Sequence, residues 1–326
     1  MKNYLLDLRQ KFRPAVPVLS MSVHEHGCRW IYGLARQSGV LSFASIRCSG
    51  GAEMEKGSDI SGDSLSAELL GGFLDGALQK IGANQFPKPV VAVFSIPSSR
   101  AFMCELTAEK NAQEEDLRFQ IEDLLSMAAG EQIEEMIYDW QPKLKQENDS
   151  AGQNLVVASV MRKLLDEIHL GCKAHHLRCL GVTLDNIAAV NGFLQAADKK
   201  DAIGNPRFIL YGEICKTKVR LNVFMDGFLC HENQDFSEDG FSVVQSIASL
   251  EKLVEIWMRG EPDQGEGNSK LIVGGELMVS KTAMATIKRS RILADKIFEV
   301  KPLAQIQEHW FVDVVAYGAL EGMPCE

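Results

Sequence analysis

The chain has 326 residues, of which 46% are hydrophobic and 24% are charged, and its formal net charge is -10. This composition is typical of a soluble globular protein, and the length suggests about two domains. The acidic balance argues against nucleic-acid binding, which requires a clustered basic surface. No apolar run approaches the roughly 18 residues of a membrane-spanning helix, and the first residues lack the apolar core of a signal peptide. We therefore expect a cytoplasmic protein.

Strand and helix signals alternate along the first part of the chain, which indicates an α/β architecture. Three consecutive strands of an antiparallel meander are predicted at 17–23, 29–35 and 40–46. A polar loop at 49–62 follows, and hydrophobic residues at helical spacing then predict a helix at 65–81. The segment VVAVFSIP at 90–97 predicts the next buried strand.

The segment 98–141 departs from this alternation and predicts a small inserted subdomain. It consists of two extended pieces, SSRAFMCEL and EEMIYDWQ, around the acidic helical run TAEKNAQEEDLRFQIEDLLSM. One face of this helix is apolar and carries Leu117, Ile121, Leu124 and Leu125, whereas the acidic residues stay in solvent. An apolar groove with an acidic rim suits a basic amphipathic peptide. The alternative is that the apolar face is only the core of the subdomain.

The pattern then repeats. We predict a strand at 154–161, a helix at 162–172, a strand at 176–183 and a helix at 185–197 with Asp185 as its N-cap. A polar break at 198–206 predicts the domain boundary. A second meander is expected at 207–214, 218–224 and 228–232. After it we predict a helix at 240–259, a strand at 271–275, a helix at 279–289, a strand near 296–300 and a last helix at 309–321.

Both halves thus open with a three-stranded meander and continue with alternating helices and strands, so the element order is duplicated. This order is that of the actin-like (ASKHA) α/β fold, with two domains and a small subdomain inserted in the first. We predict domain I at 1–200, with the insertion at about 98–141, and domain II at 201–326. The last helix, at about 309–321, is expected to pack back on domain I.

Over nearly its whole length the sequence resembles the type IV pilus assembly protein PilM family, an actin-like group related to MshI and HofM. The resemblance rests on the order and spacing of VVAVFSIP, EEDLRFQIEDLLSM, EEMIYDW, NLVVASVMRKLLDEIHLGCKAHHLRCLGVTLDNIAAVNGF, VRLNVFMDGF, LIVGGE and VVAYGALEG. It implies a non-catalytic scaffold that is peripherally associated with the inner membrane. The scaffold would support the platform and motor of a type IV pilus, or of a related competence or secretion system.

The resemblance also implies the partner. A PilN-like bitopic inner-membrane protein would insert its cytoplasmic N-terminal tail into a groove beside the inserted subdomain. To this groove we assign Leu117, Arg118, Ile121, Glu122, Leu124, Leu125 and Tyr138. Self-association into a homo-oligomer stays open.

The sequence departs from the family at the turns that bind nucleotide phosphates. Working turns carry an Asp-x-Gly pattern, because glycine lets backbone N–H groups approach phosphates and the carboxylate holds magnesium through water. Ser22 and His24 stand at these places in the first meander, and Glu213 and Cys215 stand there in the second. The pair Gly274-Gly275 remains at the adenosine-side turn. We therefore expect no cofactor and no catalysis.

The alternative is a nucleotide-binding ATPase switch with altered turns. ATP and magnesium would then meet Ser22, His24, Glu213, Lys216, Gly274 and Gly275.

No metal site is expected. Cys172, His175, His176 and Cys179 are zinc-ligand types in a C-x2-H-H-x2-C arrangement, but the segment maps onto a helix end that enters a strand. A strand directs the two adjacent histidines to opposite faces, whereas a tetrahedral site needs converging ligands. The sequence also contains no P-loop, GxSxG or GxGxxG motif.

Overall fold

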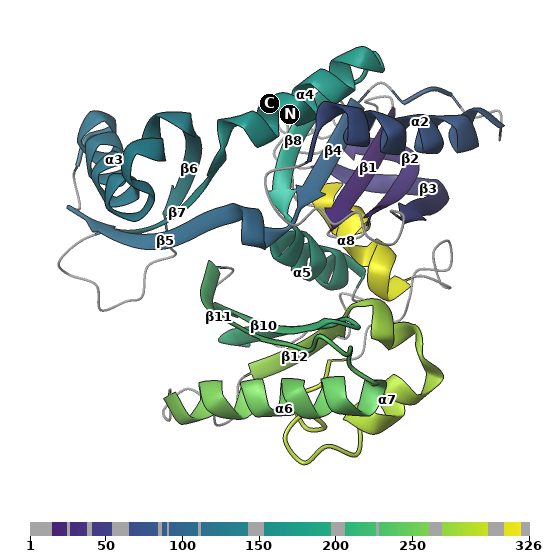
Figure 1. The fold of residues 1–326 in the computed structure, drawn as a ribbon, viewed down its shortest axis with the longest axis vertical. Helices are drawn as coiled ribbons and strands as arrows, with labels where there is room; N and C mark the ends of the chain where they lie inside the picture. Colours follow the sequence, from purple (N-terminus) through teal and green to yellow (C-terminus); the bar gives the residue numbers. More distant parts are fainter. Residues whose placement is uncertain are drawn as a thin grey trace, which may run out of the picture.

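The computed structural model describes residues 15–24, 27–37, 41–53, 65–83, 87–89, 91–109, 112–142, 153–196, 206–225, 228–260, 269–298 and 310–320. Within these ranges the chain forms three β-sheets with helices packed on them (Figure 1). Most of the polar break predicted as the domain boundary, at 198–206, lies outside the described residues.

The first sheet has the strand order β3-β2-β1-β4-β8. Its meander consists of β1 (Val16–His24), β2 (Gly27–Gln37) and β3 (Leu41–Glu53), and the parallel strands β4 (Val91–Ile96) and β8 (Arg178–Leu184) complete it. The predicted antiparallel meander is confirmed, but β3 continues into the predicted polar loop. Gly50 and Gly51 pair with Trp30 and Arg29, whose side chains lie where a β-carbon would be, and glycine makes this close approach possible.

Helices cover both faces of the first sheet. On one face α2 (Ala67–Ala83) and α4 (Arg162–Ala174) pack over a large apolar core. On the other face lie α5 (Asp185–Ala196) and α8 (Trp310–Leu320), which separate the first sheet from the second (Figure 1).

The second sheet has the strand order β11-β10-β9-β12. Its strands are β9 (Phe208–Ile214), β10 (Lys218–Met225), β11 (Phe228–Phe236) and β12 (Ser269–Gly274), and its outer face is covered by α6 (Val243–Gly260) and α7 (Lys281–Ile287). A short 3-10 turn, η4 (Glu276–Val279), follows β12. The strand predicted near 296–300 is reduced, in its described part, to a single bridge between Leu271 and Ile297.

The last helix, α8, packs against elements from the first half of the chain. The Ser20 hydroxyl of β1 donates to the carbonyl of Ala316, and Arg29 of β2 pairs with the buried Asp313 at 2.6 Å. A β-carbon on Gly318 would lie 1.7 Å from the carbonyl oxygen of Ala188 in α5, so glycine sets the close contact of these two helices.

The third sheet, here called the inserted sheet, has the order β5-β7-β6. Its strands are β5 (Ala101–Ala108), β6 (Met136–Pro142) and β7 (Gln153–Met161), and it carries α3 (Glu114–Ala129) with the 3-10 turns η1 (Ser98–Arg100) and η2 (Gly130–Glu135). β7 pairs with β5 and with β6, so the insertion extends beyond residue 141 to include a strand that the sequence assigned to the larger domain.

Candidate functional site

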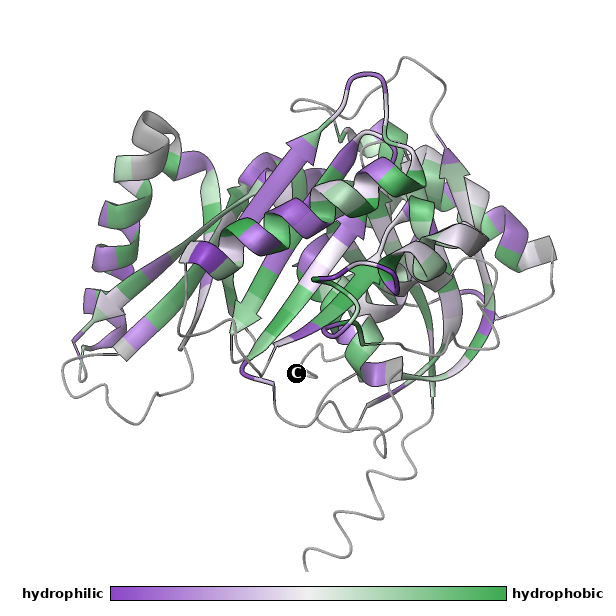
Figure 2. Ribbon diagram, turned by 90° about the horizontal axis from the view of Figure 1, so that it is seen from below, coloured by the Kyte–Doolittle hydropathy of each residue, from purple (hydrophilic) through white to green (hydrophobic). Residues whose placement is uncertain are grey.

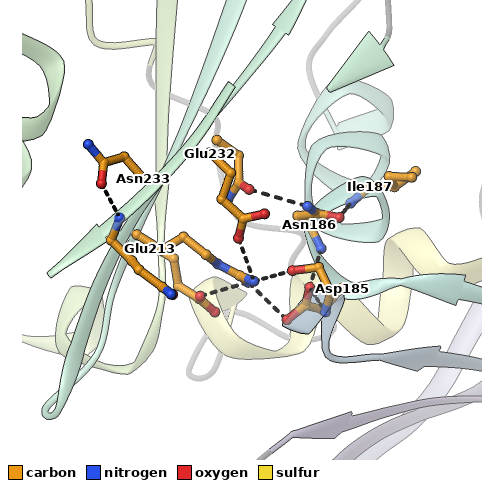
Figure 3. Close-up of polar contacts among 10 residues, drawn as sticks. Asp185, Asn186, Ile187, Glu213, Glu232 and Asn233 are labelled. Carbon is orange, nitrogen blue, oxygen red and sulfur yellow. Dashed lines mark hydrogen bonds and ion pairs between the residues drawn. The ribbon is translucent and has the colours of Figure 1, made fainter. Parts of the chain in front are cut away.

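A buried cation lies between the first and second sheets. Arg220 is in the middle of β10 and is 2% exposed, and it lies opposite Glu213 in the pairing of β10 with β9. Its Nη2 atom lies 2.9 Å from Asp185 Oδ2 and 2.9 Å from Glu213 Oε2, and its Nη1 atom lies 3.7 Å from Glu232 Oε1. Nη1 also donates to the Ser98 hydroxyl. We call these five residues the Arg220 cluster (Figure 3).

The cluster joins elements from both halves of the chain. Figure 3 shows Glu213 and Glu232 on strands of the second sheet, facing Asp185 at the start of α5. Asp185 was expected as the N-cap of α5. Its Oδ1 atom accepts the Asn186 N–H of the first helical turn at 2.7 Å and also the Ser98 N–H at 2.9 Å, while its Oδ2 atom binds Arg220. Beside it, the buried Asn186 donates to Asn222 Oδ1 at 3.2 Å.

Electrostatics keeps the cluster charged. Burial raises the pKa of Asp185, but the charge of Arg220 and hydrogen bonds from Arg220 and Ser98 outweigh burial and hold that pKa below its ordinary value. Burial lowers the pKa of Arg220, and the carboxylates of Asp185 and Glu213 raise it well above its ordinary value. Because removing one member of such a buried set leaves an unpaired charge, its loss strongly destabilises the folded protein.

The six residues predicted for a nucleotide lie on two sheets. Ser22 and His24 are on β1, where Ser22 is 4% exposed and lies between Arg29 and Ser95 of the neighbouring strands. The other four gather at one end of the second sheet: Gly274 pairs with Glu213, and Glu276, which follows Gly275, accepts the Lys216 N–H at 2.6 Å.

Packing within the protein accounts for the second-sheet residues. Glu213, which would meet ATP and magnesium under the alternative of a nucleotide switch, is ion-paired with Arg220. Gly275 has φ +102°, and a β-carbon there would lie 2.5 Å from the Ile214 carbonyl oxygen. A β-carbon on Gly274 would lie 2.9 Å from the hydroxyl of Tyr211. Each feature therefore has a structural reason that does not involve a nucleotide.

The residues predicted for the partner groove divide into two groups. Ile121 and Leu125 are fully buried and pack with Val157 of β7, so they form the core of the inserted subdomain and do not line an open groove. This corrects the prediction for these two residues, because α3 uses their side of the helix to cover the sheet. Leu117 and Leu124 are half-buried.

The polar members of this predicted groove interact with one another or with α3. Tyr138 donates to Glu122 Oε1 at 2.9 Å, and burial together with this acceptor raises the pKa of the Tyr138 hydroxyl. Arg118 pairs with Glu114 one helical turn away at 2.7 Å, and both side chains are exposed.

Two large apolar side chains on α3 point into solvent. Phe119 is 73% exposed and Met127 is 78% exposed. In Figure 2, hydrophobic and hydrophilic residues are interspersed along this helix, which lies at the left. Phe119 falls outside the apolar stripe predicted from the sequence, so helical periodicity did not single it out.

A groove of about 500 Å³ separates the inserted sheet from the second sheet. We call it the β5–β11 groove, and it is lined by Ser98, Ala101, Phe102, Met103, Cys104, Glu105, Val156, Leu229, Cys230, His231 and Glu232. Its walls come from strands that are far apart in the sequence, so no local sequence motif predicts the groove.

The Cys/His segment has ordinary structural contacts. The His175 ring lies 2.8 Å from the Gly171 carbonyl and 3.0 Å from Asp75 Oδ1. His176 has φ +55° and belongs to the turn before β8, which corrects the predicted strand start. Among the described residues no group of three or more His, Cys, Asp or Glu side chains is placed to hold a metal ion. Within the same ranges, no helix has both the length and the apolar character needed to cross a membrane.

No protein-family model matches the sequence, and no curated protein matches it either. A solved structure described as a PilM-PilN type IV pilus biogenesis complex matches with a TM-score of 0.66 at 12% identity, covering 96% of this chain and 100% of the other. A Bacteroides thetaiotaomicron protein with an actin-like ATPase fold and unknown function gives 0.44 at 14% identity, covering 87% and 91%. The cytoplasmic domain of EpsL, an inner membrane component of the Vibrio cholerae type II secretion system, gives 0.46 at 13% identity, covering 80% and 83%. The match to the PilM-PilN structure over nearly the whole chain, together with the two repeated meanders, shows the actin-like fold that the duplicated element order predicts.

Proposed function

We propose that this protein is a non-catalytic scaffold of a type IV pilus or a related secretion or competence platform. It is cytoplasmic and peripheral to the inner membrane, where it binds the cytoplasmic N-terminal tail of a PilN-like membrane protein. The likeness of the whole chain to a PilM-PilN complex supports this assignment.

The observation that carries the non-catalytic part of the proposal is the Arg220 cluster. Phosphoryl transfer needs a carboxylate that holds magnesium and backbone N–H groups that approach the phosphates. Here the candidate carboxylate, Glu213, lies 2.9 Å from a buried guanidinium that it shares with Asp185. A magnesium ion would have to displace an internal cation that is already paired. The scaffold proposal therefore has stronger support than an ATPase switch.

Charge supports the binding part of the proposal. Between residues 98 and 142 the sequence has eleven acidic residues and three basic ones. Such a surface attracts a basic segment, and the exposed Phe119 on α3 offers an apolar contact beside the acidic residues. We retain Leu117, Arg118, Glu122, Leu124 and Tyr138 as proposed contact residues for the tail.

The test measures two affinities of the purified protein. A fluorescent synthetic peptide with the sequence of the cytoplasmic N-terminal tail of a PilN-like protein should bind with saturable anisotropy. Titration calorimetry with ATP and magnesium should show no heat of binding at concentrations up to about 1 mM, where a typical nucleotide site would be saturated. Micromolar ATP binding together with no tail binding would show that the scaffold assignment is wrong.

A further inference from the structure

The two walls of the β5–β11 groove are both edge strands. In the described part of the chain β5 pairs only with β7, and β11 pairs only with β10. Alternate backbone N–H and C=O groups on the outer side of each strand therefore have no ladder partner. Such an edge is a template for an additional strand.

Most of the side chains that line the groove are apolar, and two of them are acidic. Phe102 is 37% exposed, and Met103 and Leu229 also line the groove, while Glu105 and Glu232 contribute carboxylates.

We propose that the β5–β11 groove binds an extended segment of another protein by strand addition, independently of tail binding on α3. The groove residues of β5, 101–105, span about 16 Å at roughly 3.3 Å per residue, which sets the bound segment at about five residues. The segment alternates apolar side chains, which lie on the Phe102 face of β5, with basic side chains, which lie on the opposite face with Glu105. Its backbone supplies the hydrogen bonds that the two edges lack.

The probe is an acetylated and amidated (Lys-Val)5 peptide with a fluorescent label. It should bind with saturable anisotropy, and hydrogen exchange should slow in 101–105 and 229–232. Two matched peptides test the chemistry. One carries proline in place of the central valine, which removes a backbone donor and should weaken binding at least about tenfold. The other, (Glu-Val)5, should not bind because its charge matches that of the groove.

Two protein variants locate the site. Glu105→Lys on β5 should weaken (Lys-Val)5 binding by about tenfold or more. Asp139→Lys makes the same charge reversal on β6, at the opposite edge of the same sheet, and should leave the affinity within about twofold. Equal losses in the two variants would show that only net charge attracts the peptide, and would overturn the proposal.

A measurement on the unaltered protein does not depend on how the variants fold. Cys230 is an exposed thiol in the groove, and Cys48 is a half-buried thiol on the first sheet. Bound (Lys-Val)5 should slow alkylation of Cys230 by N-ethylmaleimide and leave Cys48 unchanged, as read by mass spectrometry. Exchange protection confined to α3, or unchanged alkylation of Cys230 at saturating peptide, would refute strand addition in this groove.

Discussion

Replacing Arg220 with methionine removes the central charge of the Arg220 cluster and keeps most of the apolar volume of the side chain. The guanidinium is buried, touches two carboxylates at 2.9 Å and donates to Ser98. Asp185 keeps its bond from the Ser98 N–H, but Glu213 loses its paired cation. Breaking one side of a buried ion pair costs about 3–5 kcal/mol, so Arg220→Met should lower the free energy of unfolding by that amount.

The assay is urea unfolding followed by circular dichroism. Arg118→Met is the matched control, because Arg118 pairs with Glu114 at 2.7 Å with both side chains exposed. Loss of that pair should cost at most about 0.5 kcal/mol. In a double-mutant cycle, adding Asp185→Asn to Arg220→Met should cost less than Asp185→Asn alone, since the two groups interact directly. A loss below about 1 kcal/mol for Arg220→Met, or strict additivity, would refute the role given to the cluster.

Three further predictions concern stability and tail binding. Gly318→Ala places a β-carbon against the Ala188 carbonyl and should destabilise the protein by about 1–3 kcal/mol. Gly72→Ala in α2, where nothing lies within 4 Å of the added β-carbon, should stabilise it by about 0.5–1 kcal/mol. Thermal unfolding of both variants measures the difference. The pKa of Asp185 is lower in the folded state than in the unfolded state. Its contribution to the free energy of unfolding is therefore complete above the unfolded value of about 3.9 and is lost as the pH falls through the folded value. In acid titrations, Asp185→Asn should consequently lose less stability below about pH 4 than the unaltered protein does. Phe119→Glu should weaken binding of the synthetic tail about tenfold, and Leu170→Glu, at a 53% exposed position on α4, should leave it unchanged; equal losses would contradict docking on α3.

The order of helices and strands in this chain was predictable because each element has a local pattern of hydrophobic residues. Strand and helix periodicity located both meanders, and their repetition indicated the actin-like fold. Strand partners were not predictable in the same way. Segment 153–161 is apolar whichever sheet it joins, and its place between β5 and β6 depends on pairing across the chain. A buried strand carries no local signal that distinguishes one partner from another.

The candidate site was partly visible in the sequence. Arg220 is a single charge within the apolar strand KVRLNVF, and an arginine in such a position is rarely buried without a charged partner. That signal could have predicted its pairing with Glu213 on the preceding strand. The apolar stripe of α3 was identified correctly, but periodicity does not tell whether a residue faces a sheet or a ligand, and Ile121 and Leu125 face the sheet.

The Arg220 cluster also forms part of the β5–β11 groove. Ser98, at the root of β5, and Glu232, on β11, both line the groove and both contact the guanidinium of Arg220. One side chain therefore fixes the two walls relative to each other, and a preorganised groove binds more tightly than one that must be ordered by its ligand.

Arg220→Met should consequently weaken (Lys-Val)5 binding about tenfold under conditions where the variant remains folded. Gly318→Ala is the control for general destabilisation, because its contact with Ala188 lies in the packing of α8 on α5, and it should keep the affinity of the unaltered protein. Fluorescence anisotropy on both variants makes the comparison. An unchanged affinity in Arg220→Met would mean that the groove is shaped by the inserted sheet alone.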